Sequence, residues 1–235
     1  MNEHISSAYD RDLEAIQTLI MKMGGLVEDA ILKAATSLSD RDIELAEEVR
    51  KGDKAIDELE IQINDEAART IALRAPVSKD LRSILTVLRL AASLERIGDY
   101  AKNIAKRTSV LVEMNPVSGA DAALRRMARE VQSMLKDTLD AYIRGDAELA
   151  EEVRQRDQEV DQMYNALFRE FLTFMMEDPR NITACMHLHF MAKNIERMGD
   201  LTTNMAEQVI YLVTGEMPDE ARPKGDRTSY VTAAG

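Results

Sequence analysis

Apolar residues recur along this chain at steps of three and four, the spacing of one face of an α-helix. The pattern breaks near residues 39–41, 75–79, 115–119, 144–146, 177–180 and 214–218, so it predicts six long helical stretches. The first stripe is the clearest, and it runs Leu13, Ile16, Ile20, Met23, Val27, Ala30 and Ala34. With only 10 Gly and 5 Pro, the composition also favours an all-helical protein.

The six stripes match in pairs, first with fourth, second with fifth and third with sixth. The fourth runs Leu124, Met127, Val131 and Met134; the second Leu45, Val49, Ile56, Leu59 and Ile63; the fifth Leu149, Val153, Val160, Met163 and Leu167. The third runs Val87, Leu90, Leu94, Ile97, Ala101 and Ile104, and the sixth Leu188, Met191, Ile195, Met198, Met205 and Val209. Short connections make neighbouring helices antiparallel. The sequence therefore predicts an all-α fold, a tandem duplication of two three-helix up-down-up bundles.

The predicted bundles span residues 1–115 and 117–214, and each is long enough to bury a core of its own. The last stretch, residues 215–235, contains Pro218, Pro223 and Gly225 and has no apolar period, so it predicts a disordered tail.

Two acidic phrases also occur twice. The first pair is Glu95-Arg96-Ile97-Gly98-Asp99 with Asn103, and Glu196-Arg197-Met198-Gly199-Asp200 with Asn204. The second pair is Ala46-Glu47-Glu48-Val49-Arg50 before Asp53 and Asp57, and Ala150-Glu151-Glu152-Val153-Arg154 before Asp157 and Asp161. Residues four apart share a helix face, about 5–6 Å from each other. Each half therefore carries two acidic pairs on neighbouring helices.

The positions of the predicted turns indicate that the two acidic pairs of each half lie side by side on antiparallel helices. The pairs of the first half lie equally far in sequence from Pro76, and those of the second half lie equally far from the Asp178-Pro179 turn. Each pair also flanks its apolar stripe on the same side. Folding at those turns brings four carboxylates to one level in each bundle.

Such a gathering has two interpretations. In one, Arg50, Arg96, Arg154 and Arg197, each three residues before an aspartate, form intrahelical ion pairs and a solvated rim. In the other, ten oxygen-donating side chains form two sites for hard metal ions such as Fe, Mn, Mg or Ca. These candidate ligands are Asp53, Asp57, Glu95, Asp99, Asn103, Asp157, Asp161, Glu196, Asp200 and Asn204. Because the acidic pairs recur in both halves at matched levels along the helices, the metal-site interpretation is favoured.

Gly98 and Gly199 stand inside the acidic pairs, where a helical glycine costs about 1 kcal/mol relative to alanine. Either the missing side chain leaves space for an ion, or it allows a neighbouring helix to approach closely.

Charge and composition exclude several classes of protein. A formal charge of −12 argues against nucleic acid as a partner and gives no attraction to anionic membranes. No apolar run approaches the roughly 20 residues of a membrane span, and the start of the chain does not resemble a signal peptide. We therefore expect a cytoplasmic protein without direct membrane insertion. The sequence also contains no nucleophile–base constellation and no phosphate-cradling glycine loop, so we expect no enzyme activity.

The run from Pro76 through Asp80-Leu81-Arg82 to the Glu95–Ala105 phrase, its second copy from Glu196 to Ala206 and the acidic phrases between them resemble the PhoU family of bacterial phosphate-signalling regulators. The resemblance covers about residues 5–213. It implies two three-helix bundles, and metal clusters at the Glu/Asp-x-x-x-Asp pairs. The second copy departs from the family pattern at Met198, Leu201 and Thr202, and it has Asn181-Ile182-Thr183 in place of Asp80-Leu81-Arg82. We therefore expect the first copy to hold metal more fully.

The resemblance further implies a homodimeric adaptor that couples a phosphate ABC transporter to a sensor histidine kinase. Such an adaptor negatively regulates phosphate uptake and phosphate-starvation signalling. Two alternatives remain at this point. A metal-free helical scaffold would keep the fold without ions. A carboxylate-bridged di-iron oxidase would also use a helical bundle, but its Glu-x-x-His motif is absent from the sequence.

Overall fold

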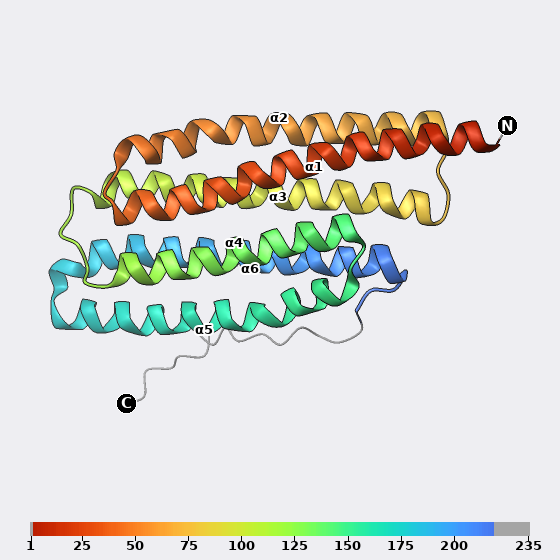
Figure 1. Cartoon of the computed structure of the whole chain (residues 1–235). Helices are drawn as coiled ribbons and strands as arrows, with labels where there is room; N and C mark the ends of the chain where they lie inside the picture. The colour runs from red at the N-terminus through yellow and green to blue at the C-terminus, as the bar shows by residue number, and fades with distance from the viewer. Residues whose placement is uncertain (1, 219–235) are drawn as a thin grey trace.

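The computed structural model describes residues 2–218, and this part of the chain is helical throughout, apart from its connections (Figure 1). The elements are α1 (Asn2–Ser39), α2 (Ile43–Arg74), α3 (Lys79–Leu111), α4 (Ala120–Arg144), α5 (Ala147–Glu177), the short 3₁₀-helix η1 (Pro179–Asn181) and α6 (Ile182–Thr214). The predicted all-α fold and its breaks are confirmed. The sequence pattern did not predict η1, because a three-residue helix is too short to show a period.

The two halves begin their second helix in the same way. Asp42 caps α2 by accepting a hydrogen bond from the backbone N–H of Leu45 at 2.9 Å, and Asp146 caps α5 by accepting from Leu149 at 3.0 Å. These caps satisfy backbone donors that a helix start leaves unpaired. The duplication therefore extends to the local signals that start the helices.

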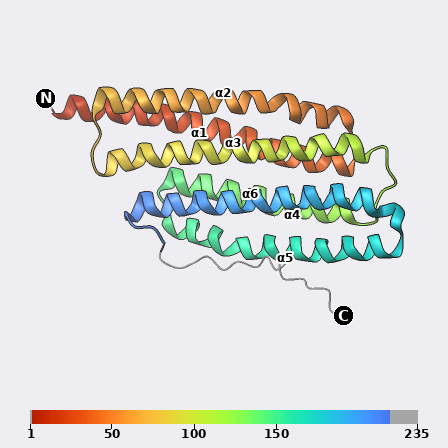
Figure 2. The same cartoon turned by 180° about the vertical axis from the view of Figure 1, so that it is seen from behind.

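Each half forms an up-down-up bundle, and the two bundles lie side by side along their length (Figures 1 and 2). Helix α1 packs against α4, and α3 packs against α6, whereas α2 and α5 lie on the outer sides. The four inner helices thus bury two faces, one inside their own bundle and one against the other bundle.

The core is continuous between the bundles, and here the structure differs from our expectation of separate cores. The buried apolar side chains of residues 2–218 include one cluster that draws on all six long helices. The apolar face of α4 is wider than one stripe, since Ala128, Leu135 and Leu139 are buried beside the predicted positions. A Cβ on Gly24 of α1 would overlap the Leu139 side chain, so these helices approach closely. The halves are therefore structural repeats that share a core.

Polar contacts also cross the boundary between the bundles. Gln132 of α4 donates to Glu28 of α1 at 2.8 Å, and Arg89 of α3 donates to Gln208 of α6 at 2.6 Å. Burial raises the pKa of Glu28, and the hydrogen bond from Gln132 opposes that effect. The bundle interface is thus apolar at its centre and hydrogen-bonded at its margins.

None of the helices in the described range has a stretch that is both long and apolar enough to span a lipid bilayer. The tail expected at residues 215–235 lies, from residue 219 on, outside the described residues. The boundaries 1–115 and 117–214 stay predictions about domains, although the connection over residues 112–119 does separate α3 from α4.

Candidate functional site: two acidic clusters

The first acidic cluster, formed by Asp53, Asp57, Glu95 and Asp99, lies where α2 packs against α3. Asp53 is 4% exposed, and its Oδ1 lies 3.8 Å from where a Cβ on Gly98 would stand. Asp53 therefore faces the α3 backbone between Glu95 and Asp99. The turn at Pro76 has aligned the acidic pairs of the two helices at one level, as the sequence predicted.

A lysine bridges this cluster. The Lys102 ammonium, carried by α3, donates to Asp53 Oδ2 on α2 and also to Asp99 Oδ1, the latter at 3.3 Å. The Asp53 side chain is 5% exposed, whereas those of Lys102 and Asp99 are 42% and 49% exposed. Ion pairing to a buried carboxylate offsets the free-energy cost of removing that charge from water. Lys102 is thus the cation that allows Asp53 to be buried.

The other two carboxyl groups of the first cluster, those of Asp57 and Glu95, have raised pKa values. Burial raises the pKa of Asp57, and the charge of Asp53 raises it further. Burial also raises the pKa of Glu95, followed by the charges of Asp99 and Glu60. Burial is the larger cause of both raised pKa values, and repulsion between like charges adds to it. Glu60 belongs to this environment although the sequence analysis did not select it.

The second acidic cluster, formed by Asp157, Asp161, Glu196 and Asp200, lies between α5 and α6. It is the more deeply buried of the two, since Asp157, Asp161 and Glu196 are 2%, 5% and 5% exposed. Lys193 donates to Glu196 Oε1 at 2.8 Å, and its ammonium stands 4.9 Å from the centre of the Tyr164 ring. The second cluster thus also has a lysine beside it, contributed from a different position of the repeat.

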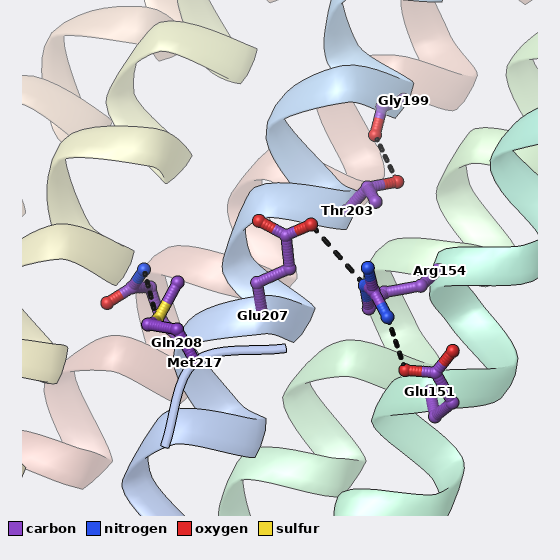
Figure 3. A network of polar contacts seen from close by, with 7 residues as sticks. All are labelled: Glu151, Arg154, Gly199, Thr203, Glu207, Gln208 and Met217. Atoms are coloured by element: carbon purple, nitrogen blue, oxygen red, sulfur yellow. Dashed lines mark hydrogen bonds and ion pairs between the residues drawn. The ribbon is translucent and has the colours of Figure 1, made fainter. Parts of the chain in front are cut away.

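Beside the second cluster, Arg154 links α5 to α6 (Figure 3). Its guanidinium donates to Glu151 on its own helix at 2.6 Å and to Glu207 on α6 at 3.3 Å. The Arg154 side chain is only 7% exposed. The corresponding Arg50 of the first half pairs with Glu47 on its own helix, at 2.8 Å, and is 42% exposed. The duplicated arginines therefore have different roles.

The two glycines inside the acidic pairs allow close helix packing. A Cβ on Gly98 would stand 3.0 Å from Ile56 Cδ1, and a Cβ on Gly199 would stand 3.2 Å from Val160 Cγ1. Distances this short leave no room for a side chain without a shift of the neighbour. The close-approach interpretation of these glycines is therefore the one that the structure supports.

The donor set suits a hard cation, but the described side chains are not arranged as a finished metal centre. Carboxylate oxygens from two helices are the ligands that hard divalent and trivalent ions prefer. Among the side chains that the structure describes, those of residues 8–218, no three His, Cys, Asp or Glu are grouped so as to hold an ion. Asn103 and Asn204 are exposed, one turn beyond the acidic pairs. In the first cluster the Lys102 ammonium takes a place between carboxylates.

We expected arginines to balance the charge of the clustered carboxylates, and the lysines were not predicted. Arg50 pairs with Glu47, and the cation on Asp53 is Lys102. One signal was available, because Lys102 follows Asp99 by three residues and so shares its helix face. Its contact with Asp53 was not predictable, since it depends on the rotation of α3 against α2.

The chain forms two consecutive three-helix bundles that are related by an internal repeat, and each bundle has an acidic cluster where two of its helices meet. This architecture places it in a class of duplicated all-α proteins. The PhoU domain model matches this chain twice, at residues 20–108 and 124–209. The chain therefore belongs to the PhoU family.

Relatives over nearly the full length support this assignment. The chain is 45% identical over 226 residues to the phosphate-specific transport system accessory protein PhoU homolog of Caulobacter vibrioides, which covers 96% of this chain and 98% of the relative. The crystal structure of PhoU from Pseudomonas aeruginosa has a TM-score of 0.86 at 39% identity, over 88% of this chain and 100% of that one. The phosphate transport system regulatory protein PhoU from Streptococcus pneumoniae has a TM-score of 0.83 at 31% identity, over 90% and 100%.

The family consists of regulatory or accessory proteins, so the chain is a non-enzymatic member of it. This assignment removes the di-iron oxidase from the alternatives.

Proposed function

We propose that this chain is a cytoplasmic regulator of phosphate uptake that acts as an accessory protein of a phosphate-specific transport system. The observation that carries the proposal is the 45% identity, over 96% of this chain and 98% of the relative, to a protein named for that role. A match of this extent spans both bundles. The regulatory title of the similar Streptococcus pneumoniae structure supports the same role.

In this role the chain is a homodimeric adaptor between a phosphate ABC transporter and a sensor histidine kinase, and it restrains phosphate uptake and starvation signalling when phosphate is plentiful. An adaptor needs surfaces rather than a catalytic centre. Six helices that run the length of two bundles offer such surfaces.

Deletion of the gene tests the regulatory role. In phosphate-rich medium the deletion strain is expected to produce alkaline phosphatase constitutively, and a plasmid copy of the gene is expected to restore repression. A deletion strain that stays repressed in rich medium, and induces normally on starvation, would contradict the proposal.

Co-purification tests the adaptor role. Tagged protein, isolated at high and at low phosphate, is expected to carry transporter components or the sensor kinase with it. Recovery of neither partner under both conditions would remove the adaptor function. Light scattering on the purified protein tests the dimer separately.

We also propose that the first acidic cluster binds a hard divalent or trivalent ion, with Asp53, Asp57, Glu95 and Asp99 as carboxylate ligands and Asn103 as a further ligand. The second cluster and Asn204 bind the same class of ion with lower occupancy. The oxygen-only donor set and the repeated acidic pairs support this proposal. The bound ion would supply positive charge that screens the carboxylates. Metal analysis of the purified protein identifies the ion among Fe, Mn, Mg and Ca.

Ion binding to the folded state alone raises the melting temperature. The metal-free protein is therefore expected to melt at a lower temperature at neutral pH and to recover with added Mn²⁺. The double variant Glu95→Gln/Asp99→Asn is expected to lose that response while keeping its helicity. If purified protein contains no stoichiometric metal and its melting ignores Mg²⁺, Mn²⁺, Fe²⁺ and chelator, the alternative of a metal-free helical scaffold is correct.

A further inference from the structure

The first acidic cluster already contains an intramolecular cation. The Lys102 ammonium joins Asp53 on α2 to Asp99 on α3, and both of these carboxylates are ligands in the metal site proposed above. It is the only Lys, Arg or His that the structure pairs with Asp53 among the residues it describes. A metal ion and this ammonium would therefore use the same oxygens.

Lys102 can also leave the cluster at small cost. Its side chain is 42% exposed, and it reaches the buried Asp53 from the solvent side. A long flexible lysine stem can move its charged end into water without breaking the packing around its base. A fully enclosed ammonium would lack that freedom.

The repeat shows that Lys102 is specific to the first half. The corresponding position of the second half is Thr203, a buried residue whose hydroxyl donates to the Gly199 carbonyl at 3.0 Å. The lysine of the second half is Lys193, which stands before Glu196 and donates to that residue of its own helix. The duplicated acidic phrase by itself does not require a lysine at position 102.

We propose that Lys102 is the built-in counter-ion of the first acidic cluster, and that a hard metal ion binds there by displacing the Lys102 ammonium. The displacement rests on the proposed metal site, whereas the counter-ion role does not. In the metal-free protein the ammonium screens the carboxylates and holds α2 to α3. In the metal-bound protein the ion takes over both tasks, and Lys102 turns to solvent.

The variant Lys102→Met tests both parts, because methionine keeps the length and packing of the stem but removes the charge. The matched control is Lys106→Met, which removes an equal charge from an exposed position one turn further along α3. Two quantities are measured on the full chain: the melting temperature in chelator, and the dissociation constant for Mn²⁺ by calorimetry. Glu95→Gln/Asp99→Asn marks loss of the site.

Without metal, Lys102→Met is expected to melt about 2–4 °C lower than both the wild type and Lys106→Met, the shift that about 1 kcal/mol produces in a protein of this size. With Mn²⁺, Lys102→Met is expected to bind on the order of tenfold more tightly than the wild type, because no ammonium competes for the carboxylates. Lys106→Met is expected to bind like the wild type.

Each departure from this result has a distinct meaning. Equal melting of the two lysine variants in chelator would overturn the counter-ion role, whether or not metal binds. A lowered melting temperature with unchanged Mn²⁺ affinity would overturn displacement. If neither the wild type nor Lys102→Met binds Mn²⁺ or another hard ion, the proposed metal site fails and displacement fails with it, while the melting data decide the counter-ion role on their own.

Discussion

Arg154 is expected to contribute more to stability than its counterpart in the first half of the repeat. It joins α5 to α6 through Glu151 and Glu207, and its own side chain is 7% exposed. The variant Arg154→Met removes the charge and keeps most of the stem. Arg50→Met makes the same change in the other half, where the arginine is 42% exposed and pairs within its own helix.

The magnitude follows from how far each partner can rehydrate. Breaking a buried ion pair costs about 3–5 kcal/mol, because one charge is left without compensation. Exposed pairs contribute about 0.2–1 kcal/mol. Glu207 and Glu151 are 22% and 43% exposed, so water can solvate part of the charge that Arg154 leaves behind. We therefore expect Arg154→Met to cost about 2 kcal/mol and Arg50→Met about 0.5 kcal/mol.

Urea unfolding in the presence of chelator measures both variants against the wild type, and circular dichroism reports the loss of helix. The double variant Arg154→Met/Glu207→Gln is expected to regain part of the lost stability, because it also removes the charge of one of the two carboxylates that lose the guanidinium. If Arg154→Met costs no more than Arg50→Met, the contact between α5 and α6 through Arg154 does not stabilise the second bundle, and the argument from burial is wrong.

Two further predictions concern packing and pH. Gly98→Ala is expected to change stability by less than about 0.5 kcal/mol. The new methyl group forces the Ile56 side chain out of its preferred rotamer, and this cost is offset by the gain of about 1 kcal/mol in helix propensity. Gly199→Ala is expected to destabilise by about 1 kcal/mol, since the stiff Val160 cannot turn away, and a double-mutant cycle with Val160→Ala that shows no coupling would refute this. Glu28→Gln is expected to stabilise the protein at pH 7, because the raised pKa of Glu28 means that stability is lost as the pH rises through that pKa. The gain should vanish below the ordinary glutamate pKa, and a gain that persists there in urea unfolding would point to packing instead.

The sequence by itself determined the helices and their pairing within each half. Stripes such as Leu13 to Ala34 encode the helical face directly, and turns at Pro76 and Pro179 are local signals. The repeated phrases around Glu95 and Glu196 were enough to predict two similar bundles and to bring the acidic pairs to one level. These features could be predicted because they depend on residues a few positions apart.

Only the tertiary structure decided what lies opposite each face. The shared core depends on side chains such as Leu139, which packs against Gly24 from the other bundle. The sequence shows that a helix has a wide apolar face, but it does not show which helix packs against that face. The contact of Lys102 with Asp53, made across the seam between α2 and α3, likewise depends on how these two helices are rotated about their axes. A helical period fixes which residues share a face, but the rotation and spacing of packed helices result from the sum of many weak contacts between segments far apart in the chain.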